Sequence, residues 1–354
     1  MKFLSLYLPA YHRIELNDKA WGEGFTEWDN VRQGKKLFKQ HYQPIVPFEE
    51  NYYDLSRKED IEKQIDIANQ YNLDGFIFYH YWFGNNVKAL EKPAEILRDE
   101  IDKSIEYCFC WANHSWLKSW HGKSGQIIAQ QVYGEKEEWI NHINYLIPFF
   151  KDSRYIKIDN RPVFYIYNMS DIKNKRMFDV WNEILEENGF GKIYLIEFIS
   201  SKNRELSYEK TDAVVEFEPL YTTFFDISKF NLFKRFICKK LKLLDFQDYD
   251  VLWRKIINRT RTYKGKTIYK GGFVGWDNSA RKGYDCMIVK NNTPEKFGKY
   301  LEALINNNRA NSSNEMIIIN AWNEWSEGAY LEPDEKNKFA YLKEIQRLST
   351  KNEQ

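Results

Sequence analysis

Two carboxylates, Glu324 and Glu327, stand three residues apart near the end of the chain, and their type and spacing suit acid–base chemistry. A turn or the start of a helix at this spacing places the two Cβ atoms about 5–6 Å apart on one side. Retaining glycosidases use two carboxyl groups about 5–5.5 Å apart, one protonated as general acid and the other ionised as base or nucleophile. An acidic pair that only favours the start of a helix has the same spacing, so both interpretations stay open.

The residues that follow the apolar runs of the chain are rich in aromatic and polar side chains. Flat aromatic faces beside amides and carboxylates suit sugar rings, whose C–H faces stack on aromatics while their hydroxyls need hydrogen-bond partners. The chain has 24 Phe, 12 Trp and 24 Tyr, so any single aromatic can equally be an ordinary buried residue. The residues predicted to bind substrate are Tyr11, His12, Trp28, His80, Tyr81, Trp82, Trp111, Asn113, Glu216, Trp276, Asp277, Asn278 and Tyr330.

Short apolar runs alternate with helix-like stretches, and this alternation predicts an α/β fold with a parallel sheet. Eight such runs favour closure into a (β/α)₈ TIM barrel, whose site gathers at the C-terminal ends of the strands. The predicted strands are residues 2–8, 75–82, 106–112, 162–168, 192–198, 213–217, 271–276 and 316–322. The predicted helices are residues 55–71, 88–102, 135–150, 175–188, 294–308 and 337–348.

Two long segments interrupt this rhythm. Residues 12–54 form a loop after the first strand, and residues 220–270 form a basic insertion after the sixth. Loops of this length in a compact domain are usually functional. We expect residues 1–354 to form a single catalytic domain that contains the 220–270 insertion.

Composition excludes several classes of protein. The 52 Lys and Arg residues balance 51 Asp and Glu residues, which argues against a nucleic-acid partner. The four cysteines, Cys108, Cys110, Cys238 and Cys286, show no spacing for a disulfide framework or a zinc site. The first ten residues are typical of a buried strand rather than of a signal peptide, and no apolar run reaches the roughly 18 residues of a membrane span. We expect a cytoplasmic protein without a metal or another cofactor.

Several long motifs run through the chain in a fixed order. They are Tyr7-Leu8-Pro9 with Tyr11-His12, residues 21–28, 41–44, 75–83, Trp111-Ala112-Asn113, residues 275–278, and residues 320–328 with 332–334. In these motifs the chain resembles the WbsX family, which is often labelled glycosyltransferase and is also called glycoside hydrolase family 99-like. The resemblance covers nearly the whole chain and implies a role in bacterial polysaccharide or O-antigen metabolism.

The residues from Glu324 to Gly328 resemble the Glu-Trp-x-Glu-Gly segment of family 99 endo-α-mannosidases and endo-α-mannanases, which are (β/α)₈ barrels. The resemblance implies that Glu324 deprotonates the sugar 2-hydroxyl, which attacks its own anomeric carbon, and that Glu327 is the general acid/base. We expect burial against Trp322 or Trp325 and the charge of Glu324 to keep Glu327 protonated. His114 and His121 occupy positions that are more often acidic in the family, which bears on substrate specificity.

Two other functions compete with a retaining hydrolase or transglycosylase. Asp248-Tyr249-Asp250 matches the Asp-x-Asp with which nucleotide-sugar glycosyltransferases hold a divalent metal, although no glycine-rich phosphate loop accompanies it. A non-catalytic carbohydrate-binding protein is disfavoured because both glutamates are present. The expected partner is a glycan or a lipid-linked oligosaccharide.

The segment 229–266 has twelve basic residues against three acidic ones, with apolar residues interleaved. This pattern is typical of an amphipathic surface that meets anionic lipid, so peripheral contact with the inner membrane through 229–266 is a further hypothesis. A solvated helical lid with its lysines outward has the same pattern.

Overall fold

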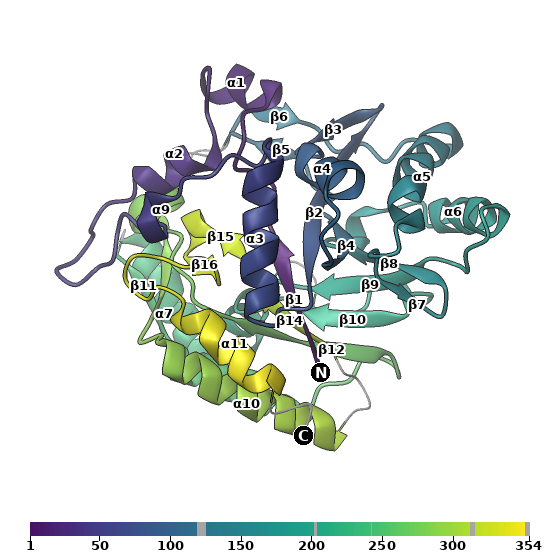
Figure 1. Ribbon diagram of the computed structural model, residues 1–354. Helices are drawn as coiled ribbons and strands as arrows, with labels where there is room; N and C mark the ends of the chain where they lie inside the picture. The colour runs from purple at the N-terminus through teal and green to yellow at the C-terminus, as the bar shows by residue number, and fades with distance from the viewer. Residues whose placement is uncertain (119–124, 202–203, 242, 312–315, 351–354) are drawn as a thin grey trace.

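The computed structural model describes residues 1–118, 125–201, 204–241, 243–311 and 316–350. Eight parallel strands close into a barrel, because β1 pairs with β2 on one side and with β14 on the other (Figure 1). The barrel strands are β1 (Lys2–Tyr7), β2 (Gly75–Gly84), β4 (Glu106–Trp111), β8 (Arg161–Ile166), β9 (Tyr194–Ile199), β10 (Ala213–Glu216), β12 (Thr267–Phe273) and β14 (Met316–Asn320). Each corresponds to one of the predicted apolar runs, so the predicted barrel is confirmed.

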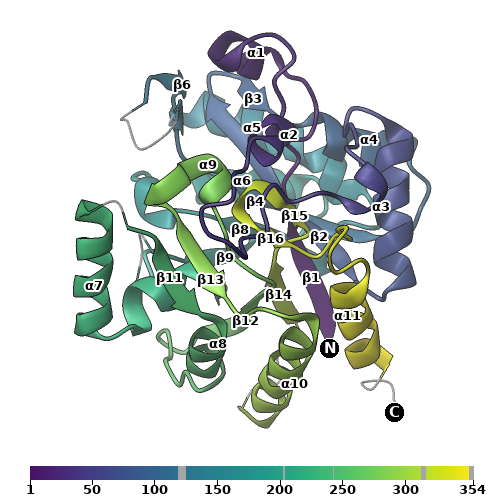
Figure 2. The same cartoon turned by 90° about the vertical axis from the view of Figure 1, so that its left-hand side faces the viewer.

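Helices surround the outside of the barrel (Figures 1 and 2). α3 shows why, because its apolar positions Ile61, Ile65 and Ala68 recur at helical spacing and are all buried. The surrounding helices are α3 (Lys58–Gln70), α4 (Lys92–Glu100), α5 (Lys136–Lys151), α6 (Arg176–Glu187), α8 (Tyr249–Ile257), α10 (Pro294–Asn311) and α11 (Ala340–Thr350).

Shorter elements build the loops above and below the barrel. The short helices are α1 (Glu15–Trp21), α2 (Glu27–Arg32), α9 (Ser279–Lys282), and the single turns Phe48–Glu50, Met169–Asp171, Thr222–Asp226, Gly283–Asp285 and Trp325–Glu327. The short strands are β3 (Val87–Ala89), β5 (Trp116–Leu117), β6 (Ile127–Ala129), β7 (Lys157–Ile158), β11 (Asp245–Asp248), β13 (Met287–Lys290), β15 (Asn323–Glu324) and β16 (Ala329–Tyr330). Within the described ranges, no helix has the length and apolar character needed to cross a bilayer.

The 220–270 segment contains α7 (Lys229–Lys240), the edge strand β11 and the barrel helix α8. β11 pairs in parallel with β13 in a small sheet of its own. α8 buries Leu252, Trp253 and Ile256 on the barrel side, so this second half of the segment belongs to the barrel wall. The predicted strand at 271–276 begins earlier than expected, at Thr267.

One basic residue of this segment, Arg259, is buried rather than exposed. Its guanidinium forms ion pairs with Glu216 at 2.5 Å, Glu218 at 2.8 Å and Asp226 at 2.6 Å. The Glu216 and Glu218 side chains are only 2% and 0% exposed, so Arg259 compensates charges that water cannot reach. Glu216, predicted to bind substrate, therefore lies in an internal ion cluster.

We predict that Arg259→Ala lowers the free energy of unfolding by about 3–5 kcal/mol, because it leaves buried carboxylates without a cation. Urea unfolding measures the effect. Arg347→Ala is the matched control, since Arg347 is 37% exposed and pairs with Glu302 and Glu344 at the surface. The control should lose no more than about 1 kcal/mol. Equal losses in the two variants would contradict the buried cluster.

Candidate active site

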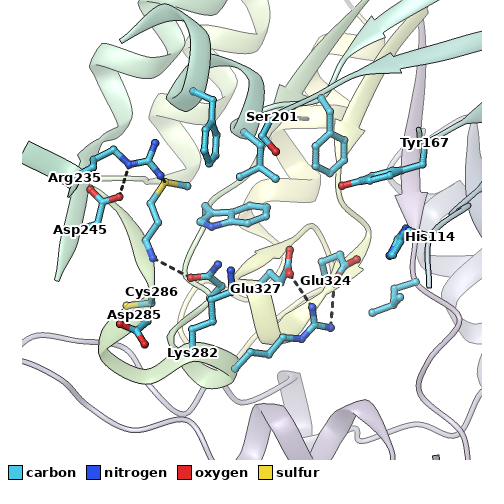
Figure 3. Close-up of a pocket in the computed structure, with 18 of the residues that line it drawn as sticks. His114, Tyr167, Ser201, Arg235, Asp245, Lys282, Asp285, Cys286, Glu324 and Glu327 are labelled. Carbon is cyan, nitrogen blue, oxygen red and sulfur yellow. Dashed lines mark hydrogen bonds and ion pairs between the residues drawn. The ribbon is translucent and has the colours of Figure 1, made fainter. Parts of the chain in front are cut away.

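A cavity of about 610 Å³ opens at the C-terminal end of the barrel (Figure 3). Every barrel strand contributes to it, either by its last residues or by the loop that follows. In chain order these lining residues are Leu8, Tyr79, Tyr81, Ala112, His114, Tyr167, Ser201, Phe217, Trp276, Asn278, Glu324 and Glu327. Such convergence of strand ends is the usual place for a barrel active site.

Glu324 and Glu327 reach this cavity together because the chain turns sharply between them. Glu324 ends β15, Glu327 ends a single helical turn, and Gly328 follows with a φ of 62°. A Cβ at Gly328 would lie only 2.8 Å from the Asp277 backbone nitrogen, so this close approach requires glycine. The turn thus fixes both carboxyl groups on one side of the cavity.

Arg281 of α9 joins the two carboxyl groups. Its Nη1 donates to Glu327 at 2.7 Å, and its Nη2 lies 3.9 Å from Glu324 (Figure 3). Glu27 of α2 holds the same guanidinium from behind, at 2.9 Å from Nε and 2.6 Å from Nη2. Ser326, between the two glutamates, also donates to Glu27. One cation therefore organises three carboxylates from opposite ends of the sequence.

The two glutamates differ in their surroundings. Burial raises the pKa of Glu324 to about 8; the charge of Glu327 raises it further and Arg281 opposes the shift. Within the described ranges, Glu324 Oε2 has no hydrogen-bond partner. We had expected Glu327 to be the protonated member, but Arg281 bonds Glu327 and the raised pKa falls on Glu324. The sequence did not reveal Arg281, so the expectation lacked its strongest charge.

Aromatic rings line the cavity beside the carboxyl pair. Tyr79 and Tyr81 come from β2, Tyr167 follows β8, and Trp276 follows β12. Asn278 also lines the cavity, and its Oδ1 accepts from the Met287 backbone at 3.0 Å. Tyr79 and Tyr167 were missed in the sequence, although Tyr79 stands two residues from Tyr81 and must share its face of the strand.

Strand alternation explains why three predicted residues lie outside this cavity. Side chains of a strand point to opposite faces in turn, so His80 and Trp82 face α5 while their tyrosine neighbours face inward. His80 contacts His142 of α5 at 2.8 Å between their Nε2 atoms, and Trp82 stacks on the same ring. The indole of Trp111 donates to the Trp82 carbonyl at 3.0 Å. All three stabilise the packing of strand against helix.

Another group of predicted residues supports the loops around the cavity. Tyr11 donates to the Asn323 carbonyl at 2.6 Å, and the indole of Trp28 donates to the Tyr53 carbonyl at 2.8 Å. Tyr330 stacks on Trp325 with ring centroids 4.2 Å apart. These contacts place the three side chains beneath the glutamate turn rather than on the cavity wall.

Asp277, His12 and Asn113 also lie off the cavity wall. Asp277 accepts from His41 at 2.7 Å and from Gln43 at 3.0 Å, and these hydrogen bonds lower its pKa against the opposing effect of burial. Its backbone nitrogen donates to the Glu327 carbonyl at 2.6 Å, so it ties the loop after β1 to the glutamate turn. The remaining two are buried: the pKa of His12 is lowered to about 4 by burial, and Asn113 bonds Asn168.

Three further positions from the sequence can be located. His114 lines the cavity next to Tyr167, whereas His121 lies outside the described residues. Asp248 caps α8 by accepting from the Val251 nitrogen at 3.0 Å. Asp250 pairs with Lys296 at 2.8 Å. The carboxylates of the Asp-x-Asp thus have structural partners away from the cavity.

The fold and the cavity together define a (β/α)₈ barrel with an acidic pair at the C-terminal ends of its strands. A family profile described as glycosyltransferase WbsX matches residues 3–345, and the chain belongs to this family. Its family and fold describe a carbohydrate-active enzyme.

Curated relatives and solved structures agree with this assignment. Uncharacterized protein WxcX from two strains of Xanthomonas campestris pv. campestris is 29% identical over 98% of the chain, which spans 49% of the length of those relatives. A glycoside hydrolase-like protein superposes with a TM-score of 0.58 at 11% identity, covering 98% of this chain and 93% of the other. The GH99 endo-alpha-mannosidase from Bacteroides thetaiotaomicron gives 0.55 at 14% identity, covering 99% and 96%. At such identities the likeness concerns the fold.

The raised pKa of Glu324 predicts a specific dependence of stability on pH. The folded protein holds a proton at Glu324 up to about pH 8, whereas the unfolded chain releases it near the ordinary pKa of 4.5. The free energy of unfolding therefore falls as pH rises through this window, by at most about 1.4 kcal/mol per pH unit. In Glu324→Gln this contribution is absent, so the variant should gain stability relative to the wild type from pH 5 towards about pH 8.

Urea unfolding of both proteins across this pH range measures the difference. Glu209→Gln is the matched control, because its side chain is 87% exposed, and it should follow the wild-type curve. Parallel curves for wild type and Glu324→Gln would show that Glu324 titrates normally.

Proposed function

We propose that the protein is a retaining glycoside hydrolase or transglycosylase of bacterial polysaccharide or O-antigen metabolism. The observation that carries this proposal is the pair Glu324 and Glu327 on one guanidinium, in a cavity with aromatic walls. A glycosidic bond needs proton donation and proton removal close together, and a sugar ring needs flat apolar faces. The endo-alpha-mannosidase with the same fold supports an α-linked glycan as the substrate class.

In the proposed reaction Glu324 is the base. Its carboxylate takes the proton of the sugar 2-hydroxyl, and O2 attacks the anomeric carbon of the same ring. The bond from that carbon to the leaving oxygen breaks, and Glu327 gives its proton to the leaving oxygen. Water or an acceptor hydroxyl then opens the anhydro ring, returning one proton to Glu327 while O2 recovers its proton from Glu324. Two inversions give net retention.

The raised pKa of Glu324 suits this role, because a carboxylate whose pKa lies near the working pH is a stronger base. Its unpartnered Oε2 can accept a hydrogen bond from the 2-hydroxyl of a bound sugar. Such a bond stabilises the ionised form of Glu324 and moves the proton of the pair toward Glu327. Substrate binding therefore sets the protonation state that the reaction needs.

We predict that Glu327→Gln and Glu324→Gln affect substrates differently. A glycoside with a good leaving group needs little protonation, so Glu327→Gln should spare it while slowing natural α-linked glycans by about 10²–10⁴-fold. Glu324→Gln should slow both kinds by a similar factor, because attack on the anomeric carbon is lost in each case. Steady-state kinetics on an aryl α-glycoside and on the matching oligosaccharide measures both.

Glu183→Gln, an exposed carboxylate on α6, is the matched control and should leave both rates unchanged. The same loss on both substrates in the two active-site variants would contradict the assigned roles. A reaction that requires a nucleotide sugar and is abolished by removal of divalent metal would instead favour a nucleotide-sugar glycosyltransferase. The capping and ion-pair contacts of Asp248 and Asp250 give that function no support.

A further inference from the structure

Helix α7 presents apolar side chains to solvent at the edge of the molecule (Figure 2). Phe233, Phe236, Leu241 and Leu243 are between 53% and 64% exposed, and Leu232 is 40% exposed. We call these five residues the α7 rim. Scattered exposed apolar residues are ordinary, but a cluster on one helix and its following turn marks an interaction surface.

The rim has a defined face. At 3.6 residues per turn, Leu232, Phe233, Phe236 and Lys240 fall within an arc of about 100°. Buried Cys238 lies on the opposite side of the helix, where α7 contacts β11. Leu232, Phe236 and Leu243 also line the active-site cavity, so the rim borders its mouth.

The charge of the segment indicates what this face meets. Residues 229–243 contain six basic residues and no acidic one; the basic residues are Lys229, Lys234, Arg235, Lys239, Lys240 and Lys242. Further along, Arg259 is buried in its ion cluster and Arg261 pairs with Glu205. The charge that favours anionic lipid is therefore concentrated at α7 rather than spread over 229–266.

We propose that α7 and the following turn dock on the surface of a bilayer that contains anionic lipid. Interfacial helices combine Phe and Leu, which enter the boundary of the acyl chains, with Lys, which contacts anionic headgroups. Docked in this way, the rim holds the mouth of the cavity against the membrane, within reach of a glycan carried on a lipid. Vesicle binding needs no glycan, so it is independent of the chemistry of the glutamate pair.

Flotation of the full chain with phosphatidylcholine vesicles, with and without phosphatidylglycerol, tests the docking. Binding should require the anionic lipid and weaken as NaCl is raised. Phe233→Ser/Leu241→Ser should lower the partition coefficient by about tenfold or more, because two apolar side chains outside the cavity lining are lost. Lys240→Gln should lower it by about fivefold.

Leu117→Ser/Ile127→Ser is the matched control, because these residues are 50% and 52% exposed on the β5–β6 pair. The control variant should bind vesicles like the wild type. Equal binding to neutral and anionic vesicles, or equal losses in the two double variants, would overturn the proposal. A concentration-dependent dimer in sedimentation velocity that Phe233→Ser/Leu241→Ser dissolves would also overturn it, by assigning the rim to a second copy of the chain.

Discussion

The guanidinium of Arg281 is the interaction on which the site depends. It bonds Glu27 and Glu327 and lies near Glu324, so one cation compensates three carboxylates that are largely removed from water. Carboxylates gathered without a cation would repel one another and would favour their neutral forms. With Arg281 in place, Glu327 has a charged partner and Glu324 keeps a raised pKa. The difference between the two glutamates thus follows from the position of one side chain.

The barrel and its loops hold this arrangement from several directions. Tyr11 bonds the carbonyl of Asn323, just before Glu324. Buried Glu332 accepts from the Trp325 indole and from Tyr53, each at 2.7 Å, and fixes the residue after Glu324. On the other side, His41 accepts from the Leu37 nitrogen through Nδ1, so Nε2 carries the proton that it donates to Asp277. The long loop after β1 therefore positions the catalytic turn rather than covering it.

The fold could be predicted from the sequence because eight continuous apolar runs mark strands buried on both faces. The site could be predicted only in part. Glu324, Glu327, Trp276, Asn278 and Tyr81 meet in one cavity, as expected of residues at strand ends. His80 and Trp82 were placed correctly along the chain, but an apolar strand gives no sign of which alternate residues face inward. Arg281 was missed because an ion pair with Glu27, 254 residues away, leaves no pattern in the local sequence.

The central claim is that Glu324 and Glu327 act on one side of a bound sugar to cleave its glycosidic bond with retention. Proton NMR of the first product from an α-linked oligosaccharide, recorded before mutarotation, tests it most directly. The account predicts that the new reducing end appears first as the α-anomer, or that the transferred sugar keeps its α-linkage. A first product with the β-configuration would contradict the account, because it would require single displacement by a water molecule between two more distant carboxylates.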